Sequence, residues 1–225
     1  MTERANKPKV NTILFISPIY EDICTLSTSE SMSHFFAYLS RMKYIQRWGL
    51  MHNVHTENIQ EHSLQVSMIA HALAVIKNRV FDGNVNPERV VVLALYHDAS
   101  EVITGDLPTP IKYFSPEIKK AYKKIEHVAN KRLYKMLPDE LKPDFESIFF
   151  SEENETENQH WQLVKAADKI SAYFKCVEER KVGNLEFAQA EKVLRKSVED
   201  TKLPEVEYFM KHFSQSVELT LDELE

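Results

Sequence analysis

A run of apolar residues that ends in ionisable side chains constrains this chain more than any other feature. Every residue of Val90–Tyr96 is apolar or aromatic, and His97 and Asp98 follow directly. Glu101 comes one helical turn after His97. A segment of this composition is typical of an element buried on all sides. Burying imidazole and carboxylate groups is costly unless they are paired or bind a metal, so a divalent cation is the first candidate to neutralise them.

Long stretches of helical periodicity and only 4 glycines in 225 residues predict an all-α protein. Start signals occur at Asn86-Pro87-Glu88 and Ser115-Pro116-Glu117, where an N-cap residue precedes a proline and an acid. Gly183 is a candidate left-handed C-cap. The sequence indicates neither a strand pair nor an internal repeat. The expected helices cover residues 33–48, 59–79, 87–102, 116–137, 159–182 and 204–224, with another after 184, a short segment over 138–150 and a polar loop over 151–158.

The composition is that of a soluble globular protein, with 43% hydrophobic and 28% charged residues. The formal net charge of -6 and the lack of a basic run argue against binding to a nucleic acid polymer. Cys24 and Cys176 are too few and too far apart for a disulfide framework. No run approaches the ~20 apolar residues of a membrane span. We therefore expect a cytoplasmic protein that contacts no membrane.

Residues 1–31 fit the helical pattern poorly, and Met32 directly precedes the first expected helix. A short apolar run follows the basic residues near the N-terminus, but Pro18 interrupts it and no small-residue cleavage site follows, which argues against a signal peptide. We interpret residues 1–31 as an N-terminal extension, either disordered or outside the native protein, and residues 32–225 as the functional domain.

Polar residues on three expected helices share a face with the apolar stripe. His62 precedes apolar residues by four, seven, eight and eleven positions, and His97 follows Leu93 by four. Asp168 has apolar residues four positions before and after it. With Asp98, these residues offer two imidazoles and two carboxylates, a set that suits a transition metal with positions open for water and substrate. A closed structural zinc site more often uses cysteine, and neither cysteine here has ligand spacing.

Helical phase alone leaves other interpretations of these residues open. A histidine on an apolar face is often a core residue bonded to a backbone carbonyl, and Asp168 can pair with a neighbouring lysine or arginine. The remaining histidines show no ligand spacing. His71, for example, lies on the opposite side of its helix from His62.

The order of a histidine, a His-Asp pair 35 residues later and a distant aspartate resembles that of the HD-domain metal-dependent phosphohydrolases. Here the matching residues are His62, His97-Asp98 and Asp168. The chain is more similar still to one branch, the small bacterial 5'-deoxynucleotidases, from residue 32 to the C-terminus. The segments that carry this resemblance are Ser33–Phe36, Ile45–Trp48, Glu57–Val66, Tyr96–Val102 and Thr104–Pro110.

The resemblance implies an all-helical HD-domain bundle, usually a homodimer, which hydrolyses deoxyribonucleoside 5'-monophosphates to a deoxynucleoside and phosphate. It implies a single divalent metal held by His62, His97, Asp98 and Asp168. In this family cobalt supports activity best in vitro, and manganese or copper substitutes in part. We expect broad tolerance of the base, selectivity against ribonucleotides and a role in nucleotide salvage.

The resemblance also assigns residues to the substrate. Arg47, which we expect on the first helix, matches the arginine that orients the phosphate, and Trp48 matches the residue placed against the sugar. A bulky ring there excludes a 2'-hydroxyl. The remaining substrate-binding residues implied are the loop Asp106, Leu107, Pro108 and Thr109, together with the metal-site residues His62, Asp98 and Asp168.

Two acidic residues are candidates for proton transfer. Glu101, one turn beyond His97, is the candidate for orienting or deprotonating a metal-bound water. Its alternative roles are partner to a histidine ring nitrogen or member of a helix salt bridge. Asp106 is the candidate for assisting protonation of the leaving group.

Two rival functions remain from the sequence. The first is an HD phosphodiesterase or nucleoside triphosphate hydrolase, but two-metal members carry further histidine ligands before the last aspartate. Only His127 and His160 lie there, and neither is in an apolar setting, which favours one metal and a monophosphate. The second rival is a non-catalytic HD signalling module, which the presence of all four ligand-type residues and Glu101 disfavours.

Overall fold

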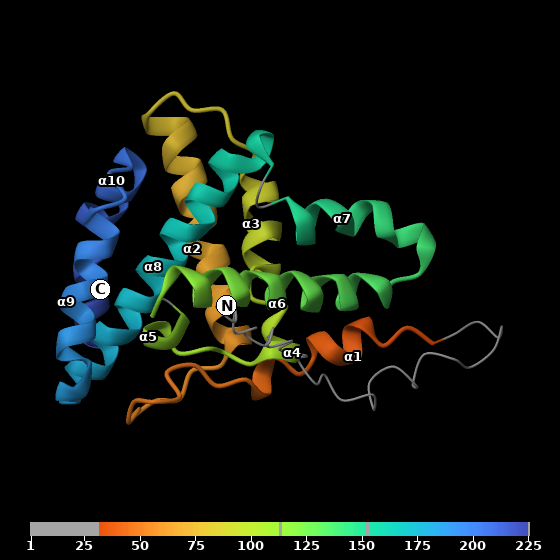
Figure 1. The fold of residues 1–225 in the computed structure, drawn as a ribbon. Helices are drawn as coiled ribbons and strands as arrows, with labels where there is room; N and C mark the ends of the chain where they lie inside the picture. Colours follow the sequence, from red (N-terminus) through yellow and green to blue (C-terminus); the bar gives the residue numbers. More distant parts are fainter. Residues whose placement is uncertain (1–31, 113, 152–153, 225) are drawn as a thin grey trace, which may run out of the picture. The chain divides into compact units, whose positions relative to one another are not determined.

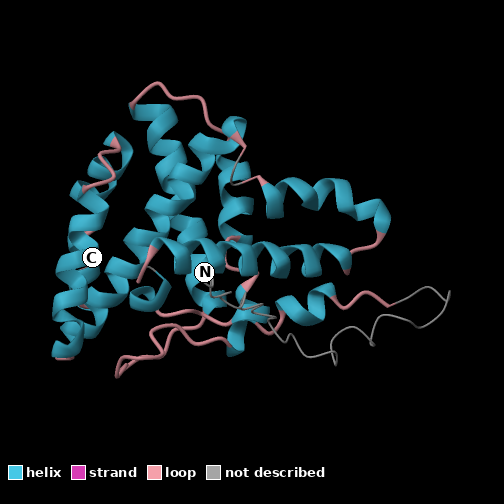
Figure 2. Ribbon diagram, viewed as in Figure 1, coloured by secondary structure: helices cyan, strands magenta, loops and turns pink. Residues whose placement is uncertain are grey.

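The computed structural model describes residues 32–112, 114–151 and 154–224. Helices account for all regular secondary structure in these residues, and the only β pairing among them is one isolated bridge between Gln46 and Asn58 (Figure 2). The residues from Ser33 onward form one compact unit. The proposed extension, residues 1–31, lies outside the described part of the chain. No helix in the described ranges is both long and apolar enough to cross a bilayer.

Ten α-helices and six short 3-10 helices follow one another along the described chain. The α-helices are α1 (Phe35–Leu39), α2 (Ile59–Val80), α3 (Pro87–Tyr96), α4 (Glu101–Thr104), α5 (Thr109–Lys112), α6 (Pro116–Lys135), α7 (Lys142–Phe150), α8 (Asn158–Lys181), α9 (Ala188–Glu199) and α10 (Pro204–Phe213). The 3-10 helices are η3 (Met42–Tyr44), η4 (Asp139–Leu141), η5 (Glu155–Glu157), η6 (Leu185–Phe187), η7 (Gln215–Glu218) and η8 (Leu221–Glu223).

Both predicted start signals, at Asn86 and Ser115, are confirmed, and each supplies a side-chain cap. The Asn86 side chain accepts a hydrogen bond from the Arg89 amide, and Pro87 occupies the first turn. The Ser115 hydroxyl caps α6 in the same way. At the start of α2, Asn58 accepts from two backbone amides, which satisfies donors that a helix N-terminus otherwise leaves free. Gly183 has a φ of 88°, as expected of a left-handed C-cap.

The main core lies where α2, α3 and α8 pack together, with α9 and α10 closing the other side of α2 and α8 (Figure 1). Leu73, Leu93 and Ile170 are fully buried, one from each of the three central helices. These helices also carry the polar residues expected at the metal site. The rigidity of the apolar core therefore fixes the relative positions of those residues.

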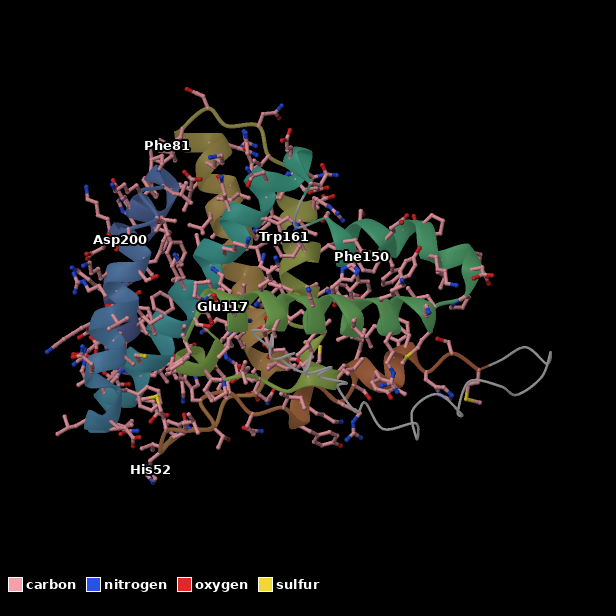
Figure 3. The ribbon with its side chains drawn as sticks, viewed as in Figure 1. His52, Phe81, Glu117, Phe150, Trp161 and Asp200 are labelled. Atoms are coloured by element: carbon pink, nitrogen blue, oxygen red, sulfur yellow. The ribbon has the colours of Figure 1, made fainter. Side chains whose placement is uncertain are left out.

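A second apolar cluster joins α1 to a hairpin made by α6 and α7, which extends away from the central helices (Figure 1). Phe35 and Leu133 are fully buried in it. Phe150, at the end of α7, packs against the rings of His127 and Tyr134 on α6 (Figure 3). The His127 side chain is exposed to solvent and contacts this cluster only through its ring.

The expected first helix over residues 33–48 is wrong in its second half. The helical chain stops after η3, because Ile45 is extended and Gln46 pairs with Asn58. The Arg47 amide then donates to the Glu57 carbonyl at 2.9 Å. Arg47 and Trp48 consequently lie on an irregular segment that is held against the start of α2.

The expected helix over 87–102 is broken at the His-Asp pair, where α3 ends and a turn leads into α4. In an uninterrupted α-helix the Ala94 carbonyl would accept from the Asp98 amide. Here it accepts from the ring of His97 at 2.7 Å, and the backbone continues through three-residue turns. The prediction of burial on all sides is also wrong, because Leu95 is 39% exposed.

The expected C-terminal helix over 204–224 ends early, at Phe213. Two 3-10 turns follow, η7 and η8, separated by an extended residue, Leu219. The Thr220 and Glu223 side chains form a capping box, which starts η8 as a separate element.

Replacing Leu73 by alanine should lower the free energy of unfolding by about 2–5 kcal/mol, because it opens a cavity between α2, α3 and α8. Urea denaturation at a fixed metal concentration measures the change. Val80→Ala, at the end of the same helix and 45% exposed, is the control and should cost far less. Equal losses for both variants would contradict this location of the core.

Candidate metal centre and substrate site

Four predicted ligand residues converge from three helices. The Nε2 atom of His62, on α2, lies 3.1 Å from Asp168 Oδ1 on α8 and 3.6 Å from Asp98 Oδ2. The Nε2 atom of His97, which caps α3, lies 3.1 Å from the same Asp98 oxygen. Ligand atoms of His62, His97 and Asp98 all fall within 4.8 Å of one another, and Asp168 adjoins this group through His62. The expected convergence is therefore present.

The ring of His97 is oriented by the backbone. Its Nδ1 atom lies 2.7 Å from the Ala94 carbonyl, which can only accept, so Nδ1 carries the proton. The lone pair is left on Nε2, which is buried and has no hydrogen-bond partner among the described residues. A neutral imidazole with a free Nε2 lone pair is the form in which histidine binds a metal.

The ring of His62 is oriented by two side chains. Its Nδ1 atom lies 3.1 Å from the Ser171 hydroxyl oxygen, and that hydroxyl donates to Gln65 Oε1 at 2.6 Å. Because the single Ser171 proton goes to Gln65, the serine oxygen accepts from His62 Nδ1–H. His62 Nε2 then also keeps its lone pair, and within the described chain it is buried without a hydrogen-bond partner.

The electrostatics of the group favour a cation at this point. Burial acts to lower the pKa of His97, but Asp98 and Asp168 outweigh it and raise that pKa to about 9. Without a metal, a proton on Nε2 supplies the positive charge, and a bound cation would displace that proton and use the lone pair. Burial acts to raise the pKa of Asp98, but His97 beside it holds that pKa far below its usual range. Carboxylates so close to imidazoles create a strong preference for added positive charge, which a divalent ion supplies.

The donor set fits a transition metal. Two imidazole nitrogens with free lone pairs face two carboxylates, a mixture of nitrogen and oxygen donors that suits zinc, cobalt, manganese or copper better than calcium or magnesium. The Asp168 side chain is 43% exposed, so one side of the group opens to solvent. His62, His97, Asp98 and Asp168 are the residues that would hold the ion.

Glu101 lies at the start of α4, beyond the break that follows His97. Its side chain is buried, and its Oε2 atom has no hydrogen-bond partner in the described ranges. Burial raises the pKa of Glu101 well above its usual range, and the nearby Asp98 and Asp106 raise it further. A carboxyl in this environment has a proton affinity suited to exchanging protons with a bound water.

Arg47 and Trp48 come close to this group from the segment before α2. The Arg47 guanidinium is 14% exposed, and its Nη1 atom is buried without a partner among the residues described. Burial acts to lower the pKa of Arg47, but Glu57, Asp168, Asp98 and Asp106 together raise it. Trp48 has a left-handed φ of 60°, and its ring contacts Phe187 edge to face at 5.3 Å.

The predicted substrate loop connects α4 to α5. Asp106, Leu107 and Pro108 are half-buried, and Thr109 is exposed at the start of α5. Burial raises the pKa of Asp106, and the neighbouring Arg47 opposes this shift while Asp98 adds to it. Asp106 on this loop therefore interacts electrostatically with both Arg47 and Asp98.

Two glutamates in this region were not singled out from the sequence. Glu57 Oε2 accepts from Trp48 Nε1 at 2.9 Å and lies 3.4 Å from Arg47 Nε. Glu179, on α8, is fully buried and accepts from the amides of Val54 and His55 at 2.9 and 3.0 Å. Their signal in the sequence is weak, since each depends on partners brought together by an irregular segment.

Glu179 fixes the loop that leads from Trp48 to α2, whose tip carries His52 at the lower edge of Figure 3. Burial acts to raise the pKa of Glu179, but hydrogen bonds from Lys175, Asn184 and the two loop amides lower it to about 2. Lys175 also donates to the His55 carbonyl. The loop therefore has charged anchors on α8 itself.

A cavity of about 340 Å³ opens beside the metal group and reaches His97, Asp98 and Asp168. It lies between α6, α7 and α8. Lysines dominate its charged lining: Lys112, Lys119, Lys123, Lys165 and Lys169. Lys112 pairs with Glu126 at 2.9 Å. The cavity is basic although the whole chain is acidic, and this local charge favours an anion close to the metal group.

The sequence matches a known family over most of its length. The profile of the YfbR-like 5'-deoxynucleotidases matches residues 34–217. The chain belongs to the YfbR-like family. A 5'-deoxynucleotidase of Vibrio parahaemolyticus is 56% identical to it over 192 residues, which span 85% of this chain and 98% of the relative. The identification as a 5'-deoxynucleotidase-like hydrolase, drawn from the sequence, is confirmed.

Solved structures confirm the all-α HD-domain fold of this YfbR-like chain. An HD-domain phosphohydrolase from Listeria innocua superposes with a TM-score of 0.71 at 22% identity, covering 82% of this chain and 88% of that one. The HD phosphohydrolase of cyanophage S-2L, bound to dA and one catalytic Zn²⁺ ion, superposes with a TM-score of 0.58 at 21% identity. That match covers 87% of this chain and the whole of the phage protein.

Ser171→Ala should weaken metal affinity by roughly 10–100-fold, because it removes the acceptor that orients His62. Competition with a chelating indicator measures the affinity for zinc or cobalt. Ser67→Ala is the matched control, since this buried serine on α2 bonds only a helix carbonyl among the contacts described. Unchanged affinity in Ser171→Ala would show that His62 is oriented by other means.

Proposed function

We propose that this chain hydrolyses deoxyribonucleoside 5'-monophosphates to a deoxynucleoside and inorganic phosphate, using one divalent metal. The observation that carries the proposal is the grouping of three buried nitrogen atoms without partners in the described chain, His62 Nε2, His97 Nε2 and Arg47 Nη1. Two of them face the carboxylates expected to share a cation, and the third is a guanidinium donor of the kind that binds phosphate. Family membership supports the same reaction.

The histidines available as metal ligands are sufficient for one metal ion. The two histidines between the His-Asp pair and Asp168 have other partners. His127 packs on Phe150, and His160 bonds Glu157 at 2.7 Å and the Asn86 amide at 3.2 Å. Both ring nitrogens of His160 are engaged, and His127 is exposed on α6. Neither histidine belongs to the group formed by His62, His97 and Asp98, which favours a phosphomonoesterase over a two-metal phosphodiesterase or triphosphate hydrolase.

The residues of the site have distinct chemical roles in this proposal. The metal, when bound, polarises a phosphate oxygen and lowers the pKa of a coordinated water. Glu101 would orient that water and, with the bound cation lowering the raised pKa of its carboxyl, would accept the proton of the water. Arg47 binds phosphate oxygens and neutralises the charge that develops on them, which a planar guanidinium does better than an ammonium group.

The sugar and the leaving group are bound on the other side of the phosphate. Trp48 packs against the deoxyribose and excludes a 2'-hydroxyl. Asp106 assists protonation of the leaving 5'-oxygen, consistent with a pKa raised by its burial. Leu107, Pro108 and Thr109 complete the wall around the sugar phosphate. The base makes few of the contacts, so several bases are accepted.

The metal with the highest activity is expected to be cobalt, with manganese or copper as partial substitutes, and zinc is a further candidate. The phage structural relative holds zinc. All of these ions accept mixed nitrogen and oxygen donors.

The chain is expected to act as a cytoplasmic homodimer in nucleotide salvage. An apolar groove of about 690 Å³ lies between α1 and α2, lined in part by Phe36, Leu64 and Leu95. Phe36 is 65% exposed, and Met68, one turn after Leu64 on α2, is 61% exposed. Exposed apolar side chains that gather in this way favour a protein contact, and a second copy of the chain is the expected partner.

Deoxyribonucleoside monophosphates should release phosphate at least about tenfold faster than the matching ribonucleotides. A phosphate-release panel tests this with mono-, di-, tri- and cyclic nucleotides and with cobalt, manganese, copper or zinc. His97→Ala is the control for contaminating phosphatases. Turnover of only cyclic or triphosphate substrates would overturn the proposal, and equal rates on both sugars would exclude the role of Trp48.

Glu101→Gln should lower kcat by roughly 10²–10⁴-fold while the protein keeps its metal, because the amide cannot accept the proton of the water. Steady-state kinetics and metal analysis of the same preparation measure both quantities. Glu117→Gln, at the exposed start of α6, is the matched control. Loss of the metal together with activity would instead make Glu101 a ligand.

A further inference from the structure

We propose that Glu57 is a positioning residue that sets sugar selectivity by holding Arg47 and Trp48 in one arrangement. The inference rests on the proposed function and extends it to a residue without an assigned role. Glu57 immediately precedes the N-cap of α2, so it is attached to the same rigid helix that carries His62. Its position relative to the metal group is therefore fixed by the core.

Glu57 holds the segment before it through both its backbone carbonyl and its side-chain carboxylate. Its backbone carbonyl accepts from the Arg47 amide at 2.9 Å, and its Oε2 atom accepts from the Trp48 indole at 2.9 Å. The same oxygen lies 3.4 Å from Arg47 Nε. The Glu57 side chain is only 12% exposed, so these contacts are shielded from water. Charge-assisted contacts of this kind are stronger than neutral ones.

The backbone at Trp48 needs such support. A φ of 60° is left-handed, and a residue with a bulky side chain enters this region only at an energetic cost. The Trp48 carbonyl accepts from the Met51 amide and the Asn53 side chain, which closes the turn. The indole bond to Glu57 fixes the remaining freedom, the orientation of the ring.

The Trp48 ring must be fixed in place if it is to exclude a ribose by the size of its 2'-hydroxyl. Trp48 is bonded to Glu57 at its N–H edge and contacts Phe187 with its ring. A ring held at both places cannot turn aside when a hydroxyl group approaches it. If the Glu57 bond is lost, the ring can move, and the extra oxygen of a ribose is then tolerated.

Glu57 also determines which part of Arg47 is available to phosphate. The carboxylate faces Nε, whereas Nη1 is the buried guanidinium atom without a partner in the described residues. The Nη atoms are therefore directed to the substrate. Glu57 Oε1 lies 4.0 Å from His62 Nδ1, but the closer partner of that nitrogen is Ser171 at 3.1 Å. Loss of Glu57 should accordingly affect substrate binding more than metal binding.

Two substitutions separate the contacts of Glu57. Glu57→Gln keeps an acceptor for the indole but removes the charge facing Arg47. We therefore expect KM for dAMP to rise about threefold to tenfold. The ratio of kcat/KM for dAMP to kcat/KM for AMP should change little, because the indole bond remains. Glu57→Ala removes both contacts, and that ratio should fall at least tenfold. Glu61→Gln, four residues along and exposed on α2, is the matched control and should leave both values unchanged.

A spectroscopic measurement distinguishes positioning from general destabilisation. The chain has two tryptophans, and the second, Trp161 near the start of α8, donates from its indole to Ser151 at 3.1 Å. In ¹H–¹⁵N NMR spectra, Glu57→Ala should shift the Trp48 indole resonance and leave that of Trp161 in place, with Trp48→Phe giving the assignment. The metal content of each variant should match that of the unaltered protein.

The outcomes distinguish this inference from the proposed function. An unaltered protein that releases no phosphate from any deoxynucleotide overturns the proposed function and the role of Glu57 with it. An active protein whose dAMP to AMP ratio survives Glu57→Ala overturns the role of Glu57 alone. A shift of both indole resonances, or loss of the metal, also counts against it, because the effect would then be general.

Discussion

The structure depends on one electrostatic requirement: carboxylates and imidazoles brought together at the centre of a helical core need an added positive charge. The apolar faces of α2, α3 and α8 pack together around Leu73, Leu93 and Ile170. Because this packing fixes the three helices, the ionisable side chains cannot move apart. Hydrogen bonds to Ala94 and Ser171 direct both Nε2 lone pairs into the same space. A cation there relieves repulsion between carboxylates and also provides the means of acting on a phosphate.

Two glutamates hold the irregular segment that carries the substrate-binding residues. The segment carrying Arg47 and Trp48 has little regular structure, yet it is fixed at one end by Glu57 and along its loop by Glu179. Both carboxylates are buried or nearly so, and both are attached to or continuous with a core helix. The substrate-facing residues thereby gain the rigidity of the core without belonging to a helix.

The sequence predicted what depends on local periodicity and missed what depends on long-range contacts. His62 and Asp168 could be placed on buried faces because α2 and α8 are regular throughout. The break in the helix at His97 could not be predicted. It arises because the His97 ring nitrogen, and not the Asp98 amide, donates to the Ala94 carbonyl. Arg47 and Trp48 were expected on a helix because nothing local signals the pairing of Gln46 with Asn58. Glu57 and Glu179 gain their partners only through that pairing and the loop after it.

The two imidazoles of the metal group differ in how they are held, and this difference makes them unequal under mutation. His97 is oriented by a main-chain carbonyl, which every residue type supplies at position 94. Its ring geometry therefore tolerates side-chain changes throughout α3 as long as the helix persists. His62 relies on the side chains of Ser171 and Gln65, so a change in either one alters the hydrogen bonds that orient its ring. Among members of the family, differences in metal affinity or in the metal bound are thus expected to arise from substitutions where α2 contacts α8.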